Sequence, residues 1–188
     1  MAKRDITQRL KDEHQLILRM LALLEKNAIL TEQGKFQDYR FYLDGVDFIR
    51  NYADRFHHAK EEDILFEALI ENGMPRANSP VAAMLMEHDL GRAFVRGMEQ
   101  AATAALNGEA DQNGAIVSNA RGYLELLREH ISKEDEILYP LAERVIPVEM
   151  REAIVQGYQK AEEKAAPELE AHYRSIVEGY EKKAAGSN

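Results

Sequence analysis

The sequence contains no cysteine among its 188 residues. Disulfide bonds, thiolate metal ligands and cysteine nucleophiles are therefore excluded. Because no structural bond of this chain requires an oxidising compartment, we expect a cytoplasmic protein.

Long apolar segments are also missing from the chain. No apolar run approaches the roughly 20 residues that a membrane-spanning helix needs. Residues 1–13 are charged and lack the apolar centre of a signal peptide. We therefore expect no membrane partner.

Basic residues are scarce relative to acidic ones, with 24 lysines and arginines against 33 aspartates and glutamates. The resulting formal charge of -9 repels phosphate backbones, so we expect no nucleic-acid partner. Strand signals are scarce as well, because alternating apolar segments bounded by hairpin turns are absent.

The apolar residues recur with helical spacing along nearly the whole chain. This pattern predicts an all-α fold, an antiparallel up-down-up-down four-helix bundle with a C-terminal helical extension. We expect the bundle over residues 1–146, and the extension over 147–188, packed on the bundle or projecting from it. Pro140 should kink or terminate the fourth helix, and Pro167 should interrupt the extension. The expected helices cover residues 6–31, 37–72, 80–106, 113–143 and 148–183.

Two segments, residues 57–66 and 130–139, nearly repeat each other. Each begins with a histidine, has a glutamate four residues later and ends in isoleucine, leucine and an aromatic residue. A Glu-His pair lies upstream of each segment, and its histidine precedes the repeat by 43 residues in one case and 42 in the other. The bundle therefore has one such histidine on each of its four helices.

This duplicated set predicts a site for two metal ions. Residues four apart lie on one face of a helix, so each repeat aims its histidine and glutamate at the same place. Unpaired imidazoles and carboxylates are costly inside a bundle, and a pair of cations removes that cost. Neutral imidazole and carboxylate suit iron, with manganese and zinc as alternatives. The candidate metal ligands are His14, His57, Glu61, His88, His130 and Glu134.

If both glutamates bridge, each ion has four protein ligands, and an oxide or hydroxide bridge makes five. An octahedral ion then keeps one open position, where a diatomic molecule or peroxide can bind. We therefore expect a small diatomic ligand or peroxide as the partner of the site.

Several polar neighbours of these residues receive other roles. His58 and Glu62 are also four apart but are rotated by about 100° from the first pair. Because the second repeat has Ile131 where the first has His58, we expect His58 behind the ligands or on the surface. For the two glutamates that precede the upstream histidines, we favour a solvated face over a hydrogen bond to a ligand. For Tyr123 we favour core packing over a place in the pocket, and we expect a structural role for His172.

With these residues assembled, the chain resembles the hemerythrin-like (HHE cation-binding) family over residues 9–142. The resemblance is carried by the strings Asp-Glu-His at 12–14, His-His-Ala-Lys-Glu-Glu at 57–62, Glu-His at 87–88 and His-Ile-Ser-Lys-Glu-Asp-Glu at 130–136. It implies a non-haem di-iron centre in an antiparallel four-helix bundle, with the six candidate residues as ligands.

The chain departs from oxygen-carrying members of this family at Arg92. Those proteins have a fifth histidine at that place, which leaves a single open site on one iron. A set of four histidines and two glutamates is more similar to di-iron proteins proposed to repair damaged iron centres. Those proteins commonly carry a cysteine-containing N-terminal module, which is absent here.

Two other classes are excluded by spacing. Ferritin-like bundles use Glu-x-x-His, whereas histidine comes first here and the spacing is four. Zinc proteases of the His-Glu-x-x-His type are excluded because that motif is absent.

The sequence thus favours a di-iron protein that binds or reduces dioxygen, nitric oxide or peroxide. The alternative is a non-enzymatic sensor of iron, oxygen or nitric oxide, or an iron-handling module, including one that repairs iron centres, with the C-terminal segment as the surface that a partner reads. A third hypothesis is a structural bundle whose site is empty or holds zinc.

Overall fold

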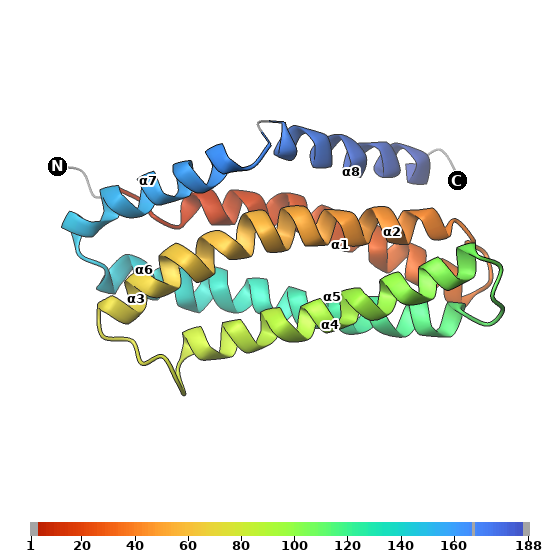
Figure 1. The fold of residues 1–188 in the computed structure, drawn as a ribbon, viewed down its shortest axis with the longest axis horizontal. Coiled ribbons are helices and arrows are strands. Elements are labelled where there is room, and N and C mark those ends of the chain that lie inside the picture. Colours follow the sequence, from red (N-terminus) through yellow and green to blue (C-terminus); the bar gives the residue numbers. More distant parts are fainter. Residues whose placement is uncertain (1–3, 167, 186–188) are drawn as a thin grey trace.

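The computed structural model describes residues 4–166 and 168–185, which form helices and no strand. Successive long helices run in opposite directions and form a bundle (Figure 1). The predicted all-α fold is confirmed. The bundle consists of α1 (Gln8–Glu32); α2 (Tyr39–Phe48), the π-helical segments η1 (Ile49–His58) and η2 (Glu61–Leu65), and α3 (Phe66–Glu71) as a second long helix; α4 (Pro80–Leu106); and α5 (Asn113–Lys133), the π-helical segment η3 (Glu134–Leu138) and α6 (Tyr139–Val145) as a fourth.

The turns between these helices form where the sequence predicts them. Gly73 and Gly108 have φ angles of +98° and +87°, a backbone conformation that glycine adopts without steric cost. At the start of α4, the Ser79 side chain accepts a hydrogen bond of 3.2 Å from the Ala82 N–H, and Pro80 occupies the first helical position. Short turns of this kind place neighbouring helices antiparallel.

The expectation that Pro140 would kink or terminate the fourth helix is wrong as to termination, because the helix continues to Val145. The π-helical segment η3 ends at Leu138, two residues before Pro140, and the Tyr139 N–H donates to the Glu134 carbonyl five residues back. Pro140 therefore lies in the first turn of α6, where a missing N–H is tolerated.

The C-terminal extension packs along the bundle as α7 (Val148–Lys164) and α8 (Leu169–Ala185) (Figure 1). Tyr173 and Val177 of α8 are buried in the same apolar cluster as α1, α2, α4 and α5. The interruption falls where the sequence predicts it, although Pro167 itself lies outside the described residues. The domain boundary at residue 146 stays a prediction.

Two apolar clusters make up the core, and a polar layer crosses the bundle between them. Along α1, for example, Leu10 belongs to one cluster and Leu16 to the other, with His14 between them. The same order recurs along α4, where Met84 and Val95 lie on either side of His88. Packing on both sides therefore fixes the height at which the polar side chains meet. No helix of the described residues combines the length and the apolar character that a membrane crossing requires.

Docking of α8 can be tested at Val177, which is 0% exposed. Val177→Asp buries an unpaired charge, and we expect it to destabilise the docked state by on the order of 3 kcal/mol. The amides of α8 should lose hydrogen-exchange protection while those of α4 and α5 keep theirs. Ser175→Asp adds the same charge on the exposed face and should leave α8 protected; equal loss in both variants would contradict this packing.

Candidate metal centre

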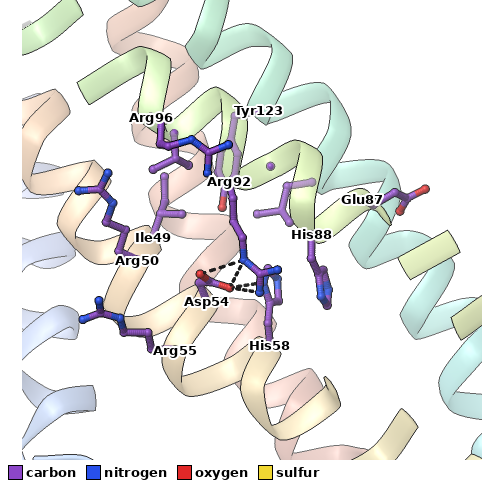
Figure 2. A pocket seen from close by; sticks show the side chains of 13 residues that line it. Ile49, Arg50, Asp54, Arg55, His58, Glu87, His88, Arg92, Arg96 and Tyr123 are labelled. Carbon is purple, nitrogen blue, oxygen red and sulfur yellow. Dashed lines mark hydrogen bonds and ion pairs between the residues drawn. The ribbon is translucent and has the colours of Figure 1, made fainter. Parts of the chain in front are cut away.

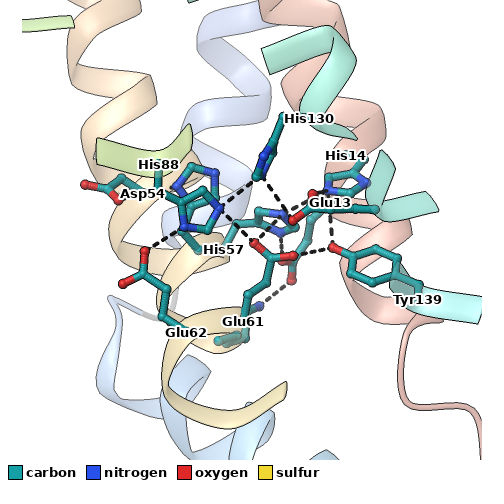
Figure 3. A network of polar contacts seen from close by, with 12 residues as sticks. Glu13, His14, Asp54, His57, Glu61, Glu62, His88, His130 and Tyr139 are labelled. Atoms are coloured by element: carbon teal, nitrogen blue, oxygen red, sulfur yellow. Dashed lines mark hydrogen bonds and ion pairs between the residues drawn. The ribbon is translucent and has the colours of Figure 1, made fainter. Parts of the chain in front are cut away.

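All six predicted ligands are buried in the polar layer. Figure 3 shows the four histidines and Glu61 facing one another, and Glu134 contacts His14 and His130. None of the six side chains is more than 2% exposed. The layer receives side chains from every long helix of the bundle, so it exists only in the folded chain. The residues are His14 of α1, His57 of η1, Glu61 of η2, His88 of α4, His130 of α5 and Glu134 of η3.

The ligand atoms fall into two groups, in each of which all atoms lie within 4.8 Å of one another. Glu61 belongs to both groups. Glu134 also contacts both halves, since its Oε2 lies 3.3 Å from His14 Nε2 and its Oε1 lies 3.1 Å from His130 Nε2. The two carboxylates therefore stand between two sets of imidazoles. The first group is His14, His57, Glu61 and Glu134, and the second is His58, Glu61, His88 and His130.

His58 is part of the second group and is buried, so of its two predicted positions, behind the ligands or on the surface, the one on the surface is wrong. It is 6% exposed, and its ring stacks on that of His88 with centroids 3.8 Å apart. The cause is the π-helical winding of η1, which takes more residues per turn than an α-helix. Successive residues are then rotated by less than about 100°, so His57 and His58 both face the interior.

His57 and His130 are each oriented by a carboxylate that lies outside the ligand set. His57 Nδ1 lies 2.9 Å from Glu13 Oε2, and His130 Nδ1 lies 2.8 Å from Glu87 Oε2. The solvated face favoured for these two glutamates is therefore wrong, and the hydrogen bond considered as the alternative is what forms. The other oxygen of each glutamate accepts a hydrogen bond from a lysine, Lys60 in one half and Lys133 in the other.

The remaining two upstream histidines are oriented in the same way by residues that sequence reasoning missed. His14 Nδ1 lies 3.0 Å from Asp135 Oδ1, and His88 Nδ1 lies 2.7 Å from Glu62 Oε1. The sequence contains a signal for these two acids, because each directly follows the glutamate of its repeat. Arg92, where oxygen carriers have histidine, donates to Glu62 and to Asp54.

These outer hydrogen bonds determine how the histidines face the centre. An Nδ1–H donated to a carboxylate leaves a lone pair on Nε2. The Nε2 atoms of His14 and His57 are 3.0 Å apart, and those of His88 and His130 are also 3.0 Å apart. Two lone pairs at that distance repel each other unless a proton or a cation lies beside them.

The carboxylates of Glu61 and Glu134 likewise require a proton or a cation beside them. Glu61 Oε2 and both oxygens of Glu134 are buried without a hydrogen-bond partner. Glu61 Oε1 accepts a hydrogen bond of 2.5 Å from the Tyr139 hydroxyl. Burial and the neighbouring Glu134 charge raise the pKa of Glu61 well above its usual range. Unpartnered carboxylate oxygens and imidazole nitrogens together form a donor set that fits a cation such as iron.

The surroundings of His14 and His57 determine which of the two rings holds a proton. Burial opposes protonation of His14, but its hydrogen bond to Asp135 and the adjacent Glu134 carboxylate outweigh this and raise the pKa of His14 to about 9. Burial and the adjacent His14 hold the pKa of His57 well below its usual range. One ring of the pair thus carries the proton, and the other stays neutral, as a metal ligand must be.

The two halves of the centre differ in their surroundings. Lys60 is 0% exposed, and its Nζ lies 3.1 Å from Glu162 Oε1 of α7, whereas the Lys133 side chain is 38% exposed. Tyr139 stacks near His14, and its counterpart in the repeat, Phe66, stacks near His88. The extension therefore closes the first half, and the second half lies beside the pocket that Arg92 lines.

The family model of the hemerythrin HHE cation-binding domain matches residues 5–142. Neither the curated proteins nor the solved structures gave a match. The matched segment includes every residue of both ligand groups and excludes α7 and α8. The sequence repeat, the buried histidine and glutamate groups and this match together place the chain in the hemerythrin HHE cation-binding domain family.

Proposed function

We propose that the protein holds two iron ions in the polar layer and binds or reduces a small oxidant there, namely dioxygen, nitric oxide or peroxide. One observation carries this proposal: in each half, two histidine Nε2 atoms meet at 3.0 Å beside buried carboxylate oxygens that lack a partner. Iron bound in this place would supply Lewis-acid and redox chemistry.

The two ions would have unequal ligand sets. His14 and His57 would hold the first, and three histidines, His58, His88 and His130, would hold the second. Glu61 and Glu134 would connect them, since each contacts histidines of both groups. The first ion, with fewer protein donors, would have room for an external ligand.

The burial of His58 at the centre bears on the departure from oxygen carriers noted at Arg92. A fifth histidine is present at the centre, but it comes from the second long helix rather than from α4. The absence of histidine at Arg92 is therefore no argument against reversible binding of oxygen. Tyr139, whose hydroxyl lies 3.4 Å from His14 Nε2 and donates to Glu61, would hold that carboxylate beside the first ion.

A second candidate function is sensing, and a specific chain of contacts favours it. Glu13 joins His57 to Lys60, and Lys60 joins Glu13 to Glu162 of α7. A change of charge at the centre would thus act on the contact between bundle and extension, where a partner could read it.

His58 tests the ligand sets. After anaerobic loading, the unmodified chain should contain about two irons, and His58→Ala should retain about one, because the second group loses a donor. His172→Ala, a change at an exposed histidine far from both groups in the sequence, serves as the matched control. Iron content is measured by elemental analysis on protein whose helicity is checked by circular dichroism. Two irons retained in His58→Ala would remove His58 from the ligand set.

Metal binding should release protons. Because the pKa of His14 is about 9 in the metal-free network, this ring is protonated at pH 7 and must lose its proton to bind a cation. Affinity should therefore rise with pH up to about 9 and fall as pH decreases. Asp135→Asn removes a hydrogen bond that raises this pKa, so its affinity should depend less on pH in that range. Zinc titration in weakly buffered solution measures the released protons; zero release at pH 7 would contradict the prediction.

The oxidant is identified by mixing the reduced, iron-loaded protein with dioxygen, nitric oxide or peroxide and following the optical spectrum. Sustained consumption of one oxidant with an added electron donor indicates an enzyme. A reversible spectral change without consumption indicates a carrier or sensor. If none of the three changes the spectrum of a protein that contains two irons, the proposed function is wrong.

A further inference from the structure

A cavity of about 230 Å³ opens beside the second half of the centre, between η1, α4 and α5 (Figure 2). His58 and His88 form part of its wall. At roughly 30 Å³ per water-sized group, this volume holds a molecule of about eight non-hydrogen atoms, which is larger than any diatomic oxidant. Its occupant is therefore a different kind of molecule from the one proposed for the metal ions.

The wall of the cavity is rich in arginine although the chain is acidic overall. Arg50, Arg55, Arg92 and Arg96 line it, and the acids of the wall are Asp54 and Glu87. Both acids already have partners, because Asp54 accepts from Arg92, and Glu87 contacts His130 and Lys133. The wall itself therefore has more basic than acidic side chains, in a protein of net charge -9.

Two of these arginines are available to a ligand. Arg50 is bound to both oxygens of Glu99, and Arg92 is bound to Asp54 and Glu62. Arg55 donates to the Asn51 amide oxygen, and neither it nor Arg96 has a carboxylate partner among the described residues. Both are exposed, so they lie where the cavity meets solvent.

The interior of the cavity is apolar with one polar group. Ile49, Val95 and Leu127 line it and are buried. Tyr123 is 2% exposed, and its hydroxyl has no hydrogen-bond partner. Figure 2 shows this hydroxyl directed between Ile49 and Arg92, into the cavity. A buried hydroxyl without a partner is costly, and an oxygen atom of a ligand would satisfy it.

We propose that this cavity binds a small organic carboxylate, whose carboxylate group pairs with Arg96 at the mouth, where Arg55 adds a second positive charge, and whose apolar body lies among Ile49, Val95 and Leu127. An oxygen atom at the inner end of the ligand accepts a hydrogen bond from Tyr123. The ligand then contacts His58 and Arg92, so its binding bears on the second half of the metal centre.

Hexanoate, with eight non-hydrogen atoms, is the first probe. Its affinity for the metal-loaded full chain is measured by calorimetry and compared with that of 1-hexanol and acetate. Hexanoate should bind most tightly, because only it offers both charge and apolar body. In the double variant Arg55→Gln with Arg96→Gln, Kd should rise about fivefold to tenfold.

Arg40→Gln is the matched control, since Arg40 is an exposed arginine outside the cavity wall. It should change the hexanoate Kd less than about twofold. Equal affinities for hexanoate and 1-hexanol, or an unchanged Kd in the double variant, would overturn the arginine site. Equal binding of acetate and hexanoate would assign the carboxylate to the metal ions and would also overturn it.

Tyr123 is tested with 5-oxohexanoate, which adds a ketone oxygen at the far end of the chain. It should bind more tightly than hexanoate, and Tyr123→Phe should remove this gain while leaving hexanoate binding within about twofold, because the ring is kept. A gain that persists in Tyr123→Phe would overturn the role of the hydroxyl.

Discussion

Two carboxylates buried among imidazoles are the constraint on which the rest of this structure depends. Glu61 and Glu134 are 0% exposed and keep oxygen atoms without hydrogen-bond partners. A bundle can hold such groups only if protons or cations compensate their charge. The outer carboxylates, the lysines that bind them and the apolar clusters above and below all serve to hold nitrogen and oxygen donors at one height. The geometry is that of a cation site, in agreement with the family to which the chain belongs.

The polar layer consists of two similar halves, which differ in solvent exposure and in helix winding. The Lys-Glu-His chain occurs in both halves, but Lys60 is sealed under α7 while Lys133 reaches solvent. The π-helical winding that turns His58 inward extends into the start of the first repeat, whereas α5 is a regular α-helix up to Lys133. One half thus contacts the extension and the other contacts a cavity. The two halves of the polar layer therefore offer a cation different surroundings.

Many residues of the centre were predictable because their positions depend on spacing within a single helix. The spacing of four residues places His57 above Glu61 on any helix, and the repeat finds the corresponding pair His130 and Glu134. The apolar periodicity likewise predicts the helices to within a few residues of their observed ends. His58 was misplaced because the assumed rotation of about 100° per residue does not hold in a π-helix. That winding leaves no mark in an apolar pattern.

The sequence alone determined the all-α fold, the family and the six candidate ligand residues, since each depends on residue type and on spacing along one helix. Tertiary structure alone decided which acid orients which histidine, that His58 joins the donors, and that α7 covers Lys60. It also decided that arginines from η1 and α4 line the same cavity as Tyr123 from α5. These relations join atoms on different helices, and their distances depend on how the helices pack, which no spacing within a single helix contains.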